Sequence, residues 1–384
     1  MGKILTCYFI LFHSFSAMLS NAHRVGITAA KLRSSTWAIV HHTLSMYDSM
    51  TLIEGWDPVL VVEGKNYKAP TETIYNVTYN VIPMSECRKV DTLIQSSFVA
   101  TAKEQEDECP GVHHVYFNQA GSYFNIVENL FANKSTVSTS NEYVFDTIWN
   151  IPSYTWQGPF LKYWRGTPDT QLHECPYVWT PNVFESRFAG FRYEPGTANR
   201  VGVYETNRVI QKVSIIPMSV VEVANRAMAI DYAQIYGLGD LNTAAFKRDV
   251  LPRLDVNWFG HADLGVLPER WSTSRIGTVV SHQLHCGLNY LWLEALHAGM
   301  ALIHNSEHIR ECGYYYDGFN VTDGAEALKR AMASHDTDED RKVRDQACLW
   351  RFSPSNPANV AWYKRLLDMT LLNRTTLRTY DGSE

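Results

Sequence analysis

The spacing of apolar residues divides the chain into helical and strand-like stretches. Residues 23 to about 55 carry apolar side chains at intervals of three and four residues, which predicts a helix. From about 57 to 215, short β-branched and aromatic runs such as Val59–Val62 are separated by Gly, Pro and Asn, which is typical of strands and long loops. Helical spacing returns in the second half, over residues 214–234, 281–296, 324–350 and 358–371.

This order of elements predicts an α+β fold, with a strand- and loop-rich N-terminal half and a helical C-terminal half. A doubly wound parallel sheet would need strands that alternate regularly with helices, and the pattern does not show that alternation. We expect three regions, which are a leader at residues 1–22, a mixed α/β region at 23–215 and a mainly helical region at 216–384. The hydrophobic residues, 45% of the chain, are enough for a sizeable core.

The leader has the composition of a secretory signal peptide. Lys3 precedes an apolar run from Ile4 to Leu19, and the small residues of Ser20-Asn21-Ala22 follow it. The run is shorter than the roughly 20 apolar residues that span a bilayer. We therefore expect cleavage, with an uncleaved membrane anchor as the alternative and an ordinary buried helix as the third interpretation.

Further signals agree with a secreted or lumenal protein of the secretory pathway. The acceptor pattern for N-glycosylation occurs at Asn76, Asn133, Asn320 and Asn373. Six cysteines follow the leader, which allows up to three disulfides in an oxidising compartment. The formal net charge of -6 argues against a nucleic-acid partner, because such proteins carry a basic face. A membrane partner is expected only if the leader stays uncleaved.

Two short segments in the second half contain candidate metal ligands. In His282-Gln-Leu-His285-Cys286 the two histidines are three residues apart, so on a helix they lie about 60° apart on one face. The segment from His308 to Cys312 repeats this form, with Glu311 at the place of the second histidine. Imidazole-rich sites suit copper, zinc, iron or nickel. The competing explanation is that these histidines are surface or capping residues, as a lone pair at this spacing usually is.

The two segments together would build one site. We expect the metal ligands to be His282, His285, His308 and Glu311. A disulfide between Cys286 and Cys312 would hold the two ligand pairs face to face, and in an oxidising compartment a disulfide is the favoured state of these cysteines. The same compartment favours copper as the metal, with zinc as the alternative.

The segment Gly277–Leu291, which contains the first histidine pair, resembles the first signature of the fungal UstYa-like family. His308-Ile-Arg-Glu311-Cys312 resembles the second signature, in which the family has a histidine where Glu311 stands, and Asp255-Val-Asn-Trp258 resembles an upstream motif. Members of the family are oxidases that tailor mycotoxins and cyclic peptides. The resemblance implies a copper-dependent oxidoreductase of secondary metabolite biosynthesis, which cyclises, hydroxylates or halogenates a small-molecule or peptide substrate.

Two other functions fit the same residues. A zinc-dependent hydrolase or lyase would use the histidines as ligands and Glu311 as its catalytic general base. A non-catalytic accessory protein of a biosynthetic pathway would have lost the chemistry with the change to Glu311. The metal content of the purified protein distinguishes the two enzymes, and replacement of His282 and His285 by Ala separates both enzymes from the accessory protein.

Overall fold

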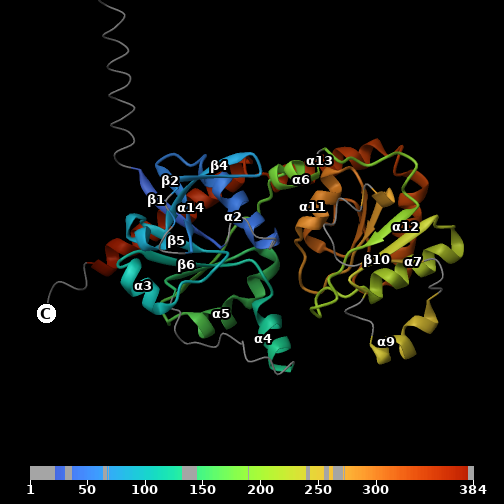
Figure 1. The fold of residues 1–384 in the computed structure, drawn as a ribbon, viewed down its shortest axis with the longest axis horizontal. Helices are drawn as coiled ribbons and strands as arrows, with labels where there is room; N and C mark the ends of the chain where they lie inside the picture. Colours follow the sequence, from blue (N-terminus) through green and yellow to red (C-terminus); the bar gives the residue numbers. More distant parts are fainter. Residues whose placement is uncertain are drawn as a thin grey trace, which may run out of the picture.

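The chain forms two largely parallel β-sheets, each covered by helices, that lie side by side (Figure 1). The computed structural model describes residues 22–30, 37–63, 67, 69–131, 145–188, 190–238, 243–254, 259–262, 271 and 273–378. In Figure 1 the blue and green elements build the first sheet, and the yellow and orange elements build the second. The red C-terminal helix lies against the first sheet.

The first sheet has eight strands in the order β3-β4-β2-β1-β5-β6-β7-β8. Its strands are β1 (His23–Ala29), β2 (Trp56–Val62), β3 (Thr71–Ile74), β4 (Val77–Pro83), β5 (Thr92–Gln95), β6 (His113–Asn118), β7 (Thr147–Asn150) and β8 (Gln171–Glu174). All neighbours pair in parallel apart from β3 and β4, which form an antiparallel hairpin at the edge. The five residues from Val25 to Ala29 are all buried, as expected for a parallel strand covered on both faces.

The second sheet has six strands, and all neighbours pair in parallel. They are β9 (Arg200–Val203), β10 (Tyr232–Tyr236), β11 (Phe259–Ala262), β12 (Thr278–Val280), β13 (Ala301–His304) and β14 (Tyr314–Tyr315). Their order, β11-β10-β9-β12-β13-β14, is the 3-2-1-4-5-6 order of the Rossmann fold. The order reverses between β9 and β12, and such a reversal marks the place where ligands bind.

Helices connect and cover the strands. The α-helices are α2 (Trp37–Met50), α3 (Ala102–Glu108), α4 (Ser122–Phe131), α5 (Gly158–Arg165), α6 (Asn182–Phe188), α7 (Ile215–Ala227), α9 (Ala244–Asp249), α11 (Tyr290–His297), α12 (Val321–Ser334), α13 (Glu339–Arg351) and α14 (Pro357–Arg378). The 3-10 helices are η1 (Met84–Lys89), η2 (Pro152–Gln157), η3 (Leu251–Arg253) and η5 (Glu307–Ile309). α14 is tied to the first sheet by a hydrogen bond of 2.7 Å between the hydroxyls of Thr92 and Thr370.

The prediction of an α+β fold is wrong, because strands and helices alternate through both halves and the sheets are largely parallel. Buried parallel strands carry no polar residue at every second position, so periodicity does not separate them from helix. β1 was hidden in this way in the stretch predicted as helix from residue 23. The change from the first sheet to the second falls between β8 and β9, before the boundary predicted at 215.

The predicted glycosylation sites lie in different surroundings. Asn76 is exposed in the turn between β3 and β4, and Asn320 is exposed and caps α12 by accepting a hydrogen bond of 3.1 Å from the Asp323 N–H. Asn133 and the leader up to residue 21 lie outside the described residues, as does the side chain of Asn373 in α14. Among the described residues no helix has the length and apolar character to cross a membrane. Secretion and glycosylation stay predictions.

Two disulfides join cysteines of the described chain, Cys87–Cys109 and Cys312–Cys348. The predicted bond between Cys286 and Cys312 is wrong, since Cys286 is a buried free thiol. Its sulfur lies 2.9 Å from the Tyr154 hydroxyl. The partner of Cys312 comes from α13, which only the packing of that helix brings near.

We expect the double variant Cys312→Ser/Cys348→Ser to lose about 2 to 4 kcal/mol of unfolding free energy, because the bond closes a long loop and so restricts the unfolded chain. The two cysteines are 36 residues apart in the sequence. Urea unfolding of the oxidised protein measures the loss. Cys286→Ser is the control, since it removes no crosslink; an equal loss in the control would contradict the assignment.

Candidate active site

A cavity of about 380 Å³ lies between the two sheets, and we call it the interdomain cavity. Its lining residues are His42, Gln119, Ala120, Gly121, Asn125, Tyr154, Tyr177, Thr206, Arg208, Val209, Gln211, Lys212, Cys286, Leu288, Asn289 and Tyr290. Three of its segments follow the carboxyl ends of β6, β9 and β12. Open parallel sheets bind ligands outside these ends, where the strand order reverses. The cavity therefore has the position of a ligand site.

The loop between β9 and α7 brings two cationic residues to the cavity, Arg208 and Lys212. Asn207 has a left-handed φ of 57°, a conformation that Asn adopts more readily than most residues. Its amide nitrogen donates to two carbonyls at the end of β10, each at 3.2 Å. A turn follows, closed by a hydrogen bond of 3.0 Å from the Lys212 N–H to the Val209 carbonyl. The base of the loop is thus held while both cations line the cavity.

Glu205, in the same loop, is a buried carboxyl group with 1% exposure. It accepts hydrogen bonds from the Ser281 hydroxyl at 2.5 Å and from the His282 N–H at 3.1 Å. Burial raises the pKa of Glu205 from 4.5 to about 7, and the Ser281 hydrogen bond and the charge of Lys212 oppose this rise. The carboxyl group of Glu205 therefore changes its charge near neutral pH, on the same loop as Arg208 and Lys212.

Several buried polar atoms at this edge of the sheet make no hydrogen bond within the described part of the chain. They are Glu205 Oε2, Thr206 Oγ1, His282 Nε2 and both amide atoms of the Gln283 side chain. Buried polar groups are normally paired, so such a set needs an explanation. Thr206 also lines the cavity. A polar ligand at the carboxyl ends of β9 and β12 would supply the missing partners.

His42, on α2, contributes a neutral imidazole to the cavity. Its ring packs against those of Tyr177 and Tyr290, with centroid distances of 5.1 and 4.4 Å. Burial lowers the pKa of His42 well below 6.5, and the charges of His41 and Lys212 lower it further. At neutral pH this side chain is therefore uncharged and can accept a hydrogen bond.

The first predicted histidine pair does not share a helix face. Residues 281–289 form a loop, because Asn289 caps α11 by accepting a hydrogen bond of 3.1 Å from the Leu291 N–H and so begins the helix at Tyr290. His282 is buried, with Nδ1 3.0 Å from the Tyr316 hydroxyl. His285 is exposed and has a left-handed φ of 49°. The predicted start of the helix at 281 is wrong.

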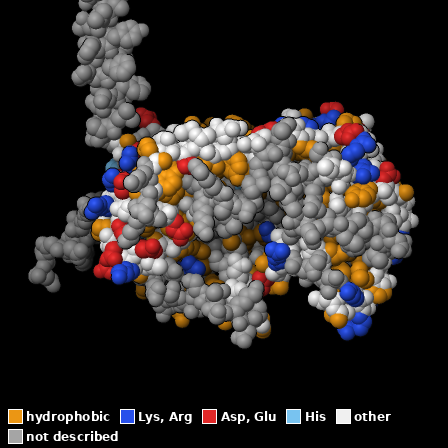
Figure 2. All heavy atoms as spheres, in the orientation of Figure 1, with side chains coloured by type: hydrophobic (Ala, Val, Ile, Leu, Met, Phe, Trp, Pro, Cys, Tyr) orange, Lys and Arg blue, Asp and Glu red, His pale blue; other side chains and the backbone are white. Residues whose placement is uncertain are grey.

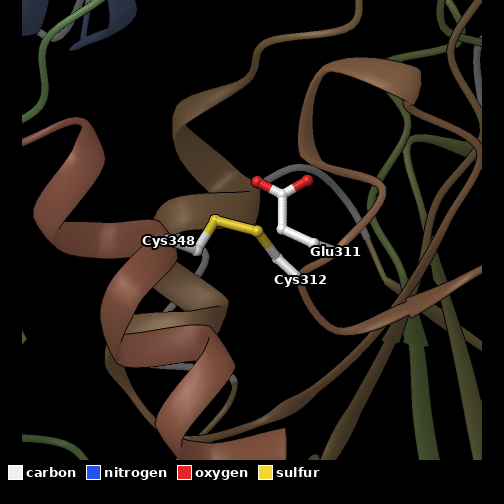
Figure 3. Close-up of side chains that lie close together, drawn as sticks. All are labelled: Glu311, Cys312 and Cys348. Carbon is white, nitrogen blue, oxygen red and sulfur yellow. A yellow bond between two sulfur atoms is a disulfide. The ribbon is translucent and has the colours of Figure 1, made fainter.

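The second predicted pair, His308 and Glu311, makes contacts with different parts of the structure. The His308 ring packs on Gly287, where an added Cβ would lie 2.3 Å from its Cδ2, and Glu311 forms an ion pair with Arg351. The described residues hold one group of potential metal ligands, Glu311, Cys312 and Cys348 (Figure 3). The two sulfurs are joined in a disulfide and leave no thiolate for a metal. The four predicted ligands form no such group.

Solved structures with the same fold share little sequence with this chain. An α-glucosyltransferase in complex with UDP and a DNA is 12% identical with a TM-score of 0.57, covering 91% of this chain and 100% of that one. A mutant O-GlcNAc transferase of Thermobaculum terrenum is 10% identical with a TM-score of 0.56, covering 93% and 69%. The N-terminal domain of Candida albicans trehalose-6-phosphate phosphatase is 10% identical with a TM-score of 0.53, covering 91% and 96%. No curated protein matches the sequence.

Two Rossmann-like sheets around a cavity, with a last helix that returns to the first sheet, define the two-domain fold called GT-B. Residues 25–367 match the model of DUF2827, a family of unknown function, and the chain belongs to that family. The resemblance to UstYa-like proteins is therefore wrong. The expectations that depended on this resemblance are wrong as well. They are the copper-dependent oxidation, the role in mycotoxin biosynthesis, the zinc hydrolase or lyase, the accessory protein of that pathway, and the copper or zinc cofactor. Asp255–Trp258 of the resemblance lie outside the described residues.

The residues that line the cavity were missed in the sequence, although part of the signal is present. The run Val201-Gly-Val-Tyr204 is followed by a polar loop and then by a helix from 215, which together form a strand–loop–helix unit. Arg208 and Lys212 stand four residues apart in that loop. His42 carries no comparable signal, because its place in the cavity depends on how α2 packs.

Proposed function

We propose that this protein is a glycosyltransferase that moves a sugar from a nucleoside-diphosphate sugar to a hydroxyl group of an acceptor. The observation that carries the proposal is the pair Arg208 and Lys212 on the loop after β9, at the reversal of strand order. Two cations suit a diphosphate, and side chains of this kind stabilise charge that develops on a phosphoryl leaving group. The complex of the similarly folded α-glucosyltransferase with UDP supports the choice of ligand.

The proposed reaction is a substitution at the anomeric carbon of the donor sugar. The acceptor oxygen forms the new bond to this carbon, and the bond from the carbon to the diphosphate oxygen breaks with its electron pair on the diphosphate. Arg208 and Lys212 hold the negative charge of the departing nucleoside diphosphate. The acceptor hydroxyl loses its proton to an oxygen of the departing diphosphate, which gains negative charge as the bond breaks. The neutral imidazole of His42 lines the cavity and is placed to accept a hydrogen bond from the acceptor hydroxyl.

The purified full-length chain is expected to bind at least one of UDP, GDP, ADP and dTDP with a dissociation constant of about 1 μM to 1 mM, the usual scale of enzyme KM values. Isothermal titration calorimetry with each nucleotide measures it. Binding should weaken as the salt concentration rises, since ions screen the contact between the cations and the diphosphate. Release of nucleoside diphosphate from the matching sugar nucleotide is the second readout. If no nucleoside diphosphate binds, the proposal fails.

A further inference from the structure

α4 and the elements beside it present an exposed aromatic surface next to the interdomain cavity. No residue of α4 is buried, although the helix has a clear apolar face. Tyr123 on α4 is 42% exposed, Trp156 on η2 is 46% exposed and Tyr163 on α5 is 84% exposed. Large aromatic side chains that remain exposed together mark binding surfaces.

Five rings of this surface are in successive contact, and we call them the aromatic row: His285, Trp156, Tyr123, Phe160 and Trp164. The ring of Phe124 packs beside the first three of them. Successive ring centroids along it are 5.5, 6.3, 5.4 and 5.5 Å apart. The row starts at the cavity, because the residue after His285 is Cys286, which lines it. It therefore leads from the cavity outward over η2, α4 and α5.

Local structure holds the row in place. The Trp156 indole N–H donates a hydrogen bond of 3.1 Å to the Ser153 carbonyl, and the Tyr123 N–H donates one of 2.9 Å to Gln157. Phe160 and Trp164 are four residues apart on α5, so they lie on one face of that helix. The rings are thus fixed before a ligand arrives, which lowers the entropic cost of binding.

The charges around the row favour an uncharged ligand. α4 contains no Lys or Arg, and its Glu128 accepts a hydrogen bond of 2.5 Å from the Ile210 N–H. α5 carries two basic residues, Lys162 and Arg165, and the guanidinium of Arg165 lies over the Tyr116 ring. A helix that lies on a membrane usually carries basic residues on its polar face, and a nucleic acid needs a basic groove beside the aromatic rings. Basic and acidic side chains are interspersed over the face seen in Figure 2.

We propose that the aromatic row binds a neutral oligosaccharide, so that the acceptor is a glycan chain whose end reaches the interdomain cavity. This rests on the proposed function. The apolar C–H faces of sugar rings pack on aromatic faces, and the spacing of the rings is close to the length of one sugar unit in a chain. Each further sugar unit of the chain then covers a further ring of the row, so that affinity rises with chain length.

The test is glycan binding by the full-length chain without a donor, measured by the change in tryptophan fluorescence. The probes are hexasaccharides of glucose, mannose, galactose and N-acetylglucosamine, in α- and β-linked forms, and the corresponding monosaccharides. At least one hexasaccharide is expected to bind about tenfold or more tightly than its monosaccharide. Calorimetry is expected to show the same gain in the wild type. The variant Tyr123→Ala/Trp156→Ala, which lacks two rings of the row, is expected to lose this gain without a change in nucleoside-diphosphate affinity.

The matched control is Leu130→Ala/Phe131→Ala, which removes two exposed apolar side chains of the same helix that lie outside the row. It is expected to bind the hexasaccharide like the wild type. The proposal is overturned if no hexasaccharide gains affinity over its monosaccharide, or if the control loses affinity as much as the row variant. It is also overturned, in favour of a membrane surface, if the chain binds phosphatidylcholine–phosphatidylglycerol vesicles in place of a hexasaccharide and the row variant loses this binding. Glycan binding without nucleotide binding would leave the row standing and remove the proposed function.

Discussion

Replacing Lys212 by Ala is expected to lower kcat/KM for sugar transfer by about 10²- to 10³-fold, the range seen when one group that stabilises a developing charge is removed. Lys212 lines the interdomain cavity on the loop after β9, and its charge lowers the pKa values of both Glu205 and His42. The ammonium group of Lys212 therefore influences the titration of side chains from both sheets. Release of nucleoside diphosphate from a sugar nucleotide measures the rate, and calorimetry measures the accompanying loss of nucleotide affinity.

Two further variants separate charge from folding. Lys212→Arg keeps the positive charge and should retain more activity than Lys212→Ala, although its planar head fits a different geometry. Lys364→Ala removes a lysine that pairs with Asp368 on the surface of α14, so it should leave the kinetics unchanged. Unchanged kcat/KM and nucleotide affinity in Lys212→Ala would refute the assignment of this loop to the donor diphosphate.

The second large effect concerns the pH dependence of stability, which Glu205→Gln is expected to flatten. The folded pKa of Glu205 is about 7 and the ordinary value is 4.5, so between these values the folded state holds a proton that the unfolded state has lost. The protonated Glu205 stabilises the folded state fully below pH 4.5, and this contribution is lost as the pH rises to about 7. The loss is on the order of 3 kcal/mol. Urea unfolding at several pH values from 4 to 8 measures it.

Asp48→Asn is the matched control, because burial also raises the pKa of Asp48, to about 7, on a different part of α2 from His42. Both variants should flatten the stability profile. Only Glu205→Gln should also reduce the weakening of nucleotide binding above pH 7, since ionised Glu205 repels a diphosphate held by the neighbouring loop. A stability profile that is equally steep in the wild type and in Glu205→Gln would contradict the raised pKa.

Several elements were predictable because their signals are local. The helices predicted at 214–234 and 358–371 correspond to α7 and α14, although the first prediction runs past the end of α7 into β10. The stretch at 324–350 is the pair α12 and α13. The strand at Val59–Val62 is part of β2. β12 and β13 were not predicted, because strands of three and four buried residues have no period that differs from that of helix.

The histidine motif shows how far spacing alone can mislead. The three-residue interval between His282 and His285 would place both rings on one side of a helix. The helix begins only at Tyr290, after its cap Asn289, so both histidines precede it. In the loop His285 has a left-handed backbone conformation and its ring lies 5.5 Å from that of Trp156, whereas the ring of His282 lies beside that of Tyr316. The motif follows the end of β12, and it resembles the other family in its sequence only.

The sequence by itself determined the sizeable core, the longer helices and the elements around the loop that carries Arg208 and Lys212, since these depend on neighbours within a few turns of chain. Only the tertiary structure decided the parallel strand order, the Cys312–Cys348 pair, and the cavity in which His42 faces the loop after β9. Each of these joins residues far apart in the sequence. Their contacts arise from the way whole sheets and helices pack to bury apolar surface, and no interval along the chain encodes them.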